Sequence, residues 1–160
     1  MGETPGATIL CYGDSNTWGH NPEDGERHEL SNRWPSVAAE ELGEGYHLIP
    51  EGLNGRTTVL DDGVEPWRNG LSYLNPCLIS HKPLEAVVIM LGTNDAKARF
   101  SLPPRDIGRG MRQLVRAVLS SESGPKGAPP MVGVIAPPLI RDETAFEGTF
   151  SGGAERSRGL

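Results

Sequence analysis

The sequence predicts a three-layer α/β/α fold built around a parallel β-sheet. Two observations predict it: short apolar runs recur with helix-sized gaps between them, and a long amphipathic pattern precedes the last run. Apolar character within each run is nearly continuous, which is typical of a strand that is covered on both faces. Alternating strands and helices favour parallel strands joined by right-handed crossovers.

The elements follow from these patterns in chain order. The predicted strands are residues 7–12, 46–49, 85–91 and 131–136. A helix is predicted over residues 34–42, with Pro35 in its first turn and Gly43 at its end. A second helix has apolar residues every three or four positions, with Asp106 as its expected cap. These apolar residues are Ile107, Met111, Leu114, Val115, Val118 and Leu119. The Pro- and Gly-rich segments 13–33, 54–83 and 124–130 are predicted to be connections.

Size and charge restrict the function classes. The 160 residues fit one domain, and the net charge of −6 argues against a nucleic acid or an anionic membrane as partner. The longest apolar run, residues 86–91, is far shorter than the roughly 18 residues of a membrane span. Glu3 stands where a secretory signal peptide carries basic residues. We therefore expect a soluble cytoplasmic protein, and homo-oligomerisation stays open.

The two cysteines do not suggest a cofactor. Cys11 and Cys77 form no Cys-x-x-Cys pattern, and the sequence predicts neither a zinc site nor a disulfide framework. We interpret both as buried thiols in a reducing compartment.

Small polar residues follow three of the four predicted strands, where an open parallel sheet has its ligand crevice. The segments are 13–16, with Gly-Asp-Ser-Asn, 52–57, with Gly-Leu-Asn-Gly-Arg-Thr, and 92–95, with Gly-Thr-Asn-Asp. Serine offers a nucleophile, asparagine offers an amide donor for an oxyanion, and glycine lets the main chain approach a ligand. Neither Gly-rich phosphate fingerprint is present, which disfavours a phosphate-binding protein.

In this order the three blocks resemble the first signature blocks of the SGNH hydrolases, also called GDSL-type esterases. Segments 13–19, 33–34, 51–58 and 89–95 are similar to the arylesterase and acyltransferase branch. The resemblance runs from Ile9 to Pro138 and continues loosely to Gly153. It implies the flavodoxin-like SGNH hydrolase fold and hydrolysis of short-chain aryl or alkyl esters, extending to acyl transfer. It also implies a small-molecule ester as partner and no cofactor.

Carried over residue by residue, the resemblance makes Ser15 the nucleophile that forms an acyl-enzyme. The oxyanion hole would consist of the main-chain N–H groups of Ser15 and Gly55 and the side-chain amide of Asn94. The expected substrate-pocket residues are Asp14, Trp18, Asn54 and Asp95. Asp14 and Asp95 are also interpreted as carboxylates that structure their loops, because each lies beside a turn. Trp18 is equally compatible with ordinary packing.

The general base is missing from the sequence. A nucleophilic serine needs a base and an orienting carboxylate, and the family supplies both from a late Asp-x-x-His block that does not occur here. The histidines are His20, His28, His47 and His81. His47 and His81 lie at or before predicted strand starts, which places them at the edge of the sheet opposite Ser15. His20 and His28 follow the first predicted strand, at the same edge of the sheet as Ser15, and we interpret them as loop histidines.

These features support the hypothesis that the chain is a fragment or premature stop of an esterase. Residues 1–150 would be an incomplete SGNH domain without its last strand and helix, and residues 151–160 would begin a truncated helix. We expect low activity and an exposed fourth strand that favours self-association. The alternative is a non-catalytic module that binds an acyl or carbohydrate ligand in the inherited cleft.

Overall fold

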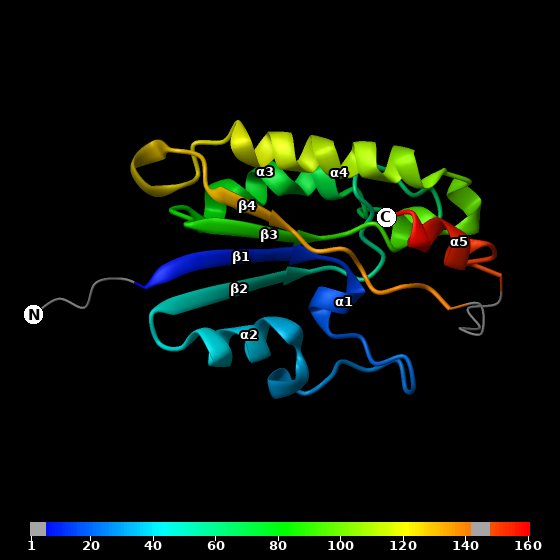
Figure 1. The fold of residues 1–160 in the computed structure, drawn as a ribbon, viewed down its shortest axis with the longest axis horizontal. Coiled ribbons are helices and arrows are strands. Elements are labelled where there is room, and N and C mark those ends of the chain that lie inside the picture. Colours follow the sequence, from blue (N-terminus) through cyan, green and yellow to red (C-terminus); the bar gives the residue numbers. More distant parts are fainter. Residues whose placement is uncertain (1–5, 142–147) are drawn as a thin grey trace, which may run out of the picture.

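A computed structural model describes residues 6–141 and 148–160 of the chain. Its centre is a parallel sheet of four strands in the order β2-β1-β3-β4 (Figure 1). The strands are β1 (Ala7–Gly13), β2 (Tyr46–Gly52), β3 (Ala86–Met90) and β4 (Met131–Val134). The predicted fold class is therefore confirmed, with each strand within about two residues of its predicted ends except β2, which extends to Gly52.

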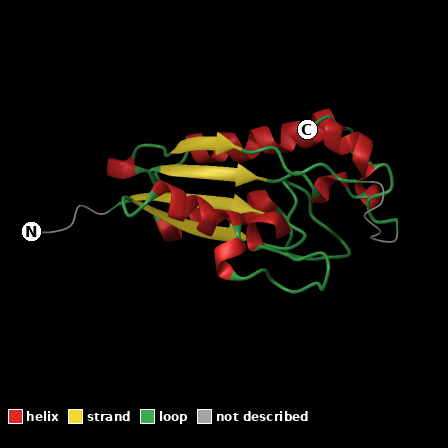
Figure 2. Cartoon of the chain, turned by 60° about the horizontal axis from the view of Figure 1, so that its bottom comes forward, coloured by secondary structure: helices red, strands yellow, loops and turns green. Residues whose placement is uncertain are grey.

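Helices cover the two faces of the sheet unequally. Helices α3 (Gly70–His81) and α4 (Pro104–Leu119) lie on one face, and α2 (Trp34–Leu42) lies on the other (Figures 1 and 2). The core forms between the sheet and the pair α3 and α4, because alternate residues of β1 and β3 point to that side. Its fully buried side chains include Leu10, Tyr12, Leu74, Leu78, Val87, Ile89, Leu114 and Val118.

The helix predictions are partly confirmed. Helix α2 has the predicted bounds and ends at Gly43, whose φ is 81°. Helix α4 begins at Pro104, and Asp106 is not its cap, because it lies in the first turn and pairs with Arg109 at 2.8 Å. The interpretation of segment 54–83 as a connection is wrong for its second half, which forms α3.

The end of the chain forms a short helix that packs against the domain. Helix α5 (Gly153–Arg158) confirms the predicted helical start. The Arg156 guanidinium donates to the carbonyl oxygen of Ala96, and Ser157 Oγ accepts from the N–H of Ile140. Such contacts are what a helix this short needs for stability. One further short helix, α1 (Ser15–Trp18), follows β1.

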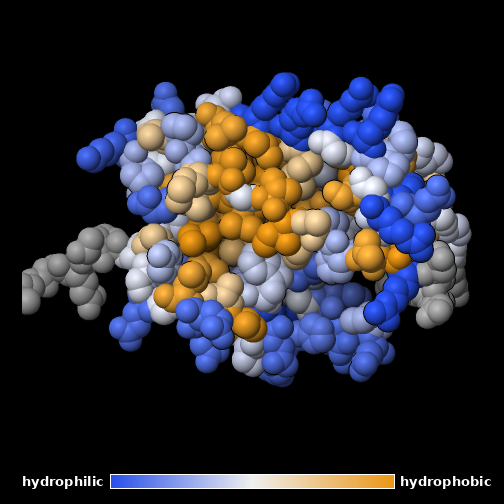
Figure 3. All heavy atoms as spheres, in the orientation of Figure 1, coloured by the Kyte–Doolittle hydropathy of each residue, from blue (hydrophilic) through white to orange (hydrophobic). Residues whose placement is uncertain are grey.

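Apolar surface remains uncovered on the α2 side of the sheet. Figure 3 shows it as an extended orange area on this face of the molecule. The register aligns Ile9, Ala86 and Met131 across this face, and Met131 is 70% exposed. Within the described residues β4 is an edge strand, as expected. No helix in the described part of the chain is both long and apolar enough to cross a membrane.

Candidate active site

Ser15 lies in a tight turn between β1 and α1. The carboxylate of Asp14 caps α1 by accepting from the main-chain N–H and the side-chain amide of Asn16, both at 2.9 Å. A Cβ at Gly13 would lie 2.0 Å from Thr17 Oγ1, so only glycine allows α1 to pack this closely on the strand end. The turn therefore fixes Ser15 at the carboxyl edge of the sheet.

Arg56 holds the ends of β1 and β2 together. It is only 2% exposed, and its guanidinium donates to the carbonyl oxygens of Gly13 and Glu51. The guanidinium carbon also lies 4.2 Å from the centre of the Tyr12 ring, a cation–π contact. Because Arg56 is the next residue after Gly55, this anchoring fixes the position of the Gly55 main chain.

Gly55 occupies a conformation that other residues adopt with strain. Its φ is 81°, and a Cβ would lie 2.9 Å from Nε of Arg68. The Gly55 N–H finds no hydrogen-bond acceptor in residues 6–141 or 148–160, and the same is true of the Ser15 N–H. Both donors are thus available to a ligand.

Asn94 follows β3 in a 3₁₀ turn and reaches the same region. Its side-chain amide donates to the carbonyl oxygen of Arg56 at 3.0 Å and lies 3.5 Å from Oδ2 of Asp14. The neighbouring Asp95 anchors the turn, because its carboxylate accepts from both the N–H and the hydroxyl of Thr58.

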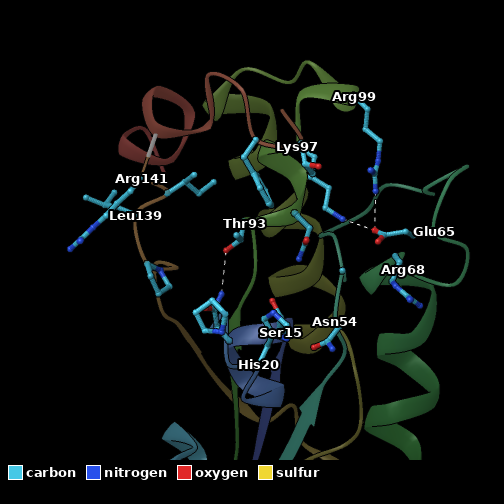
Figure 4. Close-up of a pocket in the computed structure, with 18 residues that line it drawn as sticks. Ser15, His20, Asn54, Glu65, Arg68, Thr93, Lys97, Arg99, Leu139 and Arg141 are labelled. Atoms are coloured by element: carbon cyan, nitrogen blue, oxygen red, sulfur yellow. Dashed lines mark hydrogen bonds and ion pairs between the residues drawn. The ribbon is translucent and has the colours of Figure 1, made fainter. Parts of the chain in front are cut away.

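Ser15, Gly55 and Asn94 all line one cavity of about 480 Å³ (Figure 4). One wall carries apolar residues, Leu139, Ile140 and Phe150. The other carries charged residues, Glu65, Arg68, Lys97 and Arg99. Figure 4 shows Lys97 and Arg99 directed towards Glu65, and both pair with its carboxylate. The sequence placed a nucleophile and three donors here, and the fold brings their residues together.

The expected pocket residues divide into two groups. Asn54 lines the cavity, whereas Asp14, Trp18 and Asp95 are not among the described residues that line it. Asp14 and Asp95 are fully buried beneath the site and organise its loops, in agreement with their alternative interpretation. The ring of Trp18 is covered by the Arg27 guanidinium at 4.8 Å.

Burial dominates the protonation of both buried carboxyl groups. It raises the pKa of Asp14 to about 6, against the opposing effect of the hydrogen bonds from Asn16. Burial likewise raises the pKa of Asp95, and the hydrogen bonds from Thr58 act in the opposite direction. Both groups accept hydrogen bonds within the scaffold and lie outside the cavity wall, which suits a structural role.

Among the histidines, only His20 lines the cavity. Figure 4 shows it beside Ser15, yet no hydrogen bond joins its ring to Ser15 within the described residues. His81 is the last residue of α3 and lies before the start of β3, as expected, and its Nε2 lies 2.9 Å from Oε1 of Glu51. The candidate site therefore contains the predicted nucleophile and the predicted oxyanion donors, and within the described residues no histidine is hydrogen-bonded to Ser15.

Sequence reasoning missed several residues that shape the site. Arg56 and Thr58 stood in the quoted segment 51–58, but no local pattern marks their burial. The charged wall comes from the connection before α3 and the turns after β3, and it is assembled only in the folded chain. Arg99 also pairs with the buried Asp62 in this wall.

The described residues contain a cluster of potential metal ligands, but it lies outside this cavity. It consists of Glu51, Cys77 and His81, from β2 and α3. Nothing in the cavity itself combines three such side chains among the described residues.

Comparisons with known proteins agree with the geometry. The model of the GDSL-like lipase/acylhydrolase family matches residues 11–150. The native M. smegmatis aryl esterase structure is 44% identical, with a TM-score of 0.88, over 96% of this chain and 75% of its own. Est24, a carbohydrate acetylesterase from Sinorhizobium meliloti, gives 44% identity and a TM-score of 0.88, with the same coverage of 96% and 75%.

More distant likenesses concern the fold alone. An esterase AlinE4 mutant is 18% identical, with a TM-score of 0.61, over 99% of this chain and 75% of its own. No curated protein matches the chain closely enough to count as similar. The family match extends over most of the chain and includes Ser15, Gly55 and Asn94. This chain belongs to the GDSL-like lipase/acylhydrolase family, whose SGNH members include the aryl esterase type.

Proposed function

We propose that this chain carries the acyl-transfer half of a serine esterase site and that Ser15 attacks short-chain carboxylic esters. The observation that carries the proposal is the convergence of Ser15, Gly55 and Asn94 on one cavity at the carboxyl edge of the sheet. Attack by Ser15 Oγ on the ester carbonyl would form a tetrahedral oxyanion. The Ser15 and Gly55 N–H groups and the Asn94 amide are the donors for that charge.

The cavity supports a small ester as substrate. A volume of about 480 Å³ lies at the lower end of the range for small-molecule sites. The wall formed by Leu139, Ile140 and Phe150 suits an apolar acyl or aryl group. The charged wall around Glu65 and Lys97 suits a polar alcohol. The similar structures described as an aryl esterase and a carbohydrate acetylesterase are in keeping with an apolar group at the first wall and a polar alcohol at the second.

Acyl transfer follows from the same intermediate. Once Ser15 carries the acyl group, either water or an alcohol in the cavity can attack it. An alcohol held against the charged wall would compete with water. Measuring the ratio of ester formed to acid released, at increasing alcohol concentration, tests this part of the proposal. A ratio that stays at zero would limit the site to hydrolysis.

Weak turnover is expected of the chain as it stands. No Asp-x-x-His block is present in the sequence, and no described histidine is hydrogen-bonded to Ser15. Oxyanion stabilisation and binding alone give about a thousandfold acceleration over water. That is enough to detect turnover of an activated aryl acetate but too little for ordinary alkyl esters.

The test is hydrolysis of an aryl acetate by the chain and by Ser15→Ala, with Ser31→Ala at an exposed position as the matched control. We expect Ser15→Ala to lose the protein-dependent burst of aryl alcohol, and Ser31→Ala to keep it. Mass spectrometry should find the acetyl group on the peptide that contains Ser15. Equal bursts from the chain and Ser15→Ala would overturn the assignment. Ligand retention without any acyl-enzyme would instead support the binding-module alternative.

His20 is the residue to examine for residual base activity. It lines the cavity beside Ser15, although we interpret it as a loop histidine. A phosphonate probe should label Ser15 slowly, and His20→Gln should leave that rate unchanged. Rapid labelling that His20→Gln abolishes would identify His20 as the base and contradict the expectation of weak turnover.

A further inference from the structure

Three potential metal ligands meet between the edge strand β2 and helix α3. One oxygen of Glu51, Sγ of Cys77 and a ring nitrogen of His81 all lie within 4.8 Å of one another. Cys77 and His81 are four positions apart on α3, which puts them on the same face of the helix. Glu51 approaches from β2, so the complete set exists only in the folded chain. None of the three lines the Ser15 cavity.

The spacing of the three atoms is close to that of a tetrahedral site. Zinc bonds of about 2.0–2.3 Å place neighbouring ligands roughly 3.3–3.8 Å apart. In the metal-free arrangement Nε2 of His81 and Oε1 of Glu51 are 2.9 Å apart, and no pair exceeds 4.8 Å. An adjustment of about 1 Å is within the reach of side-chain rotation alone, because the supporting strand and helix are already in place.

Burial gives the cluster a closed side and an open side. Cys77 is fully buried, whereas the side chains of His81 and Glu51 are 28% and 23% exposed. An ion can therefore reach His81 and Glu51 from solvent, and a water molecule would complete the coordination from the exposed side. A zinc site with three protein ligands and one water has this form.

The charges around the cluster are compatible with a cation. Thiolate and carboxylate together would neutralise a divalent ion, and a neutral complex lowers the cost of partial burial. His81 is the last residue of α3, where the helix dipole favours positive charge. A positive charge that acts on Cys77 comes from Arg56, whose guanidinium is engaged by the Tyr12 ring and by two main-chain carbonyl oxygens. The phenol of Tyr73 also faces Glu51.

We propose that Glu51, Cys77 and His81 bind one zinc ion, with water as the fourth ligand, at a site separate from the Ser15 cavity. The donor set of thiolate, imidazole and carboxylate is the one that zinc accepts in proteins, and it favours zinc over magnesium or calcium. The site joins the edge strand β2 to α3, so binding would add a metal cross-link to the existing contact between His81 and Glu51.

Binding requires one proton to leave. Burial raises the pKa of the Cys77 thiol to about 12, with the Glu51 charge acting in the same direction, so without metal the sulfur keeps its proton. When zinc binds, the S–H bond breaks, the electron pair on sulfur forms the Zn–S bond, and the proton passes to solvent. No oxidation takes place. Zinc binding near neutral pH should therefore release about one proton per ion.

The binding test is titration of the full 160-residue chain with Zn²⁺ in competition with a chromogenic chelator. We expect one ion per chain, and at least a tenfold loss of affinity in Cys77→Ser and in His81→Gln. Cys11→Ser is the matched control, because Cys11 is equally buried, burial also raises its pKa to about 12, and it lies outside the cluster. His81→Gln changes a partly exposed side chain and keeps the test decisive if Cys77→Ser folds poorly.

Two further measurements identify the ligands independently of activity. Co²⁺ in place of Zn²⁺ should give a thiolate-to-metal charge-transfer band in the chain and in Cys11→Ser, but not in Cys77→Ser. Added Zn²⁺ should raise the melting temperature of the chain and of Cys11→Ser, but not of His81→Gln. Failure of the chain to bind one equivalent, or binding by Cys77→Ser and His81→Gln as tight as that of the unchanged chain, would overturn the proposal. These outcomes are independent of whether Ser15 is acylated.

Discussion

The side-chain amide of Asn94 donates to the main-chain carbonyl oxygen of Arg56 at 3.0 Å, and this bond ties the end of β3 to the Gly55 loop. Arg56 in turn donates to the carbonyl oxygen of Gly13 at the end of β1. One residue thus connects the three strand ends that carry Ser15, Gly55 and Asn94. The second amide hydrogen of Asn94 has only a 3.5 Å contact, to Asp14, which is too long for a good hydrogen bond. We propose that this weakly bonded hydrogen is the one available to an oxyanion.

We predict that Asn94→Ala slows phosphonate labelling of Ser15 by about tenfold or more, because loss of one oxyanion donor typically costs a hundred- to a thousandfold in rate. The measurement is the second-order labelling rate, followed by intact-protein mass spectrometry. Asn32→Ala, in an exposed turn after α1, should label at the rate of the unchanged chain. If folded Asn94→Ala labels as fast as Asn32→Ala, Asn94 is not an oxyanion donor.

Much of the fold could be predicted because its strands are marked by local sequence. Apolar runs that end in turn residues located the strands, and their alternation with helices predicted the parallel direction, whereas the order of the strands in the sheet was not predicted. Helix α3 was missed because Pro76 lies inside it and Gly70 begins it, and both residues indicate a loop locally. Its burial against the core, through Leu74 and Leu78, overrides that local preference. Such tertiary effects have no signature in a short window.

In the candidate site, too, residues marked by local sequence could be predicted and residues placed by tertiary contacts could not. Ser15, Gly55 and Asn94 could be found because each lies shortly after the end of a strand, parallel strands end at one edge, and the blocks that contain them resemble those of the family. The role of Arg56 could not be found, because its bonds join residues 43 and 38 positions apart in the sequence. The two cavity walls come from distant connections for the same reason. The metal cluster was also missed, since Glu51 joins Cys77 and His81 only through the packing of β2 against α3.

The pairing of Thr58 with Asp95 gives a stability prediction. Thr58 is 1% exposed and supplies both N–H and hydroxyl donors to the buried carboxylate. Thr58→Val keeps the shape but removes the hydroxyl, so we expect a loss of about 1–3 kcal/mol in the free energy of unfolding. Urea denaturation measures it. Thr58→Ser, which keeps the hydroxyl, should lose less, and equal losses in both variants would contradict this explanation.

Asp14 gives a prediction about pH. Its pKa is raised from an ordinary value of 3.8 to about 6, chiefly by burial. Between about pH 4 and 6 the folded chain therefore binds more protons at this group than the unfolded chain does, so this contribution to stability falls as the pH rises. Above about pH 6 the buried charge costs on the order of 3 kcal/mol. Asp14→Asn removes that charge.

We therefore expect Asp14→Asn to gain stability relative to the unchanged chain as the pH rises from about 4 to 7. The asparagine oxygen can still accept the N–H of Asn16, so the α1 cap is largely kept. Urea unfolding of both chains at several pH values gives the difference directly. Carboxyl groups that do not interact with Asp14 are common to both chains and cancel in it, whereas Asp95, whose charge also raises the pKa of Asp14, contributes to the difference. A difference that is constant with pH would show that Asp14 does not titrate in this range.

Two glycines in α4 should respond oppositely to the same substitution. A Cβ at Gly108 meets no heavy atom within 4 Å, so Gly108→Ala should raise stability by about 0.5–1 kcal/mol through helix propensity. A Cβ at Gly110 would lie 2.3 Å from Thr58 Oγ1, so Gly110→Ala must push α4 away from the loop that positions Asp95. We expect a loss of about 1–3 kcal/mol there, as for other overpacked positions. Thermal unfolding followed by circular dichroism should show a higher melting temperature for the first variant and a lower one for the second. Shifts of the same sign would mean that α4 does not pack on Thr58 as described.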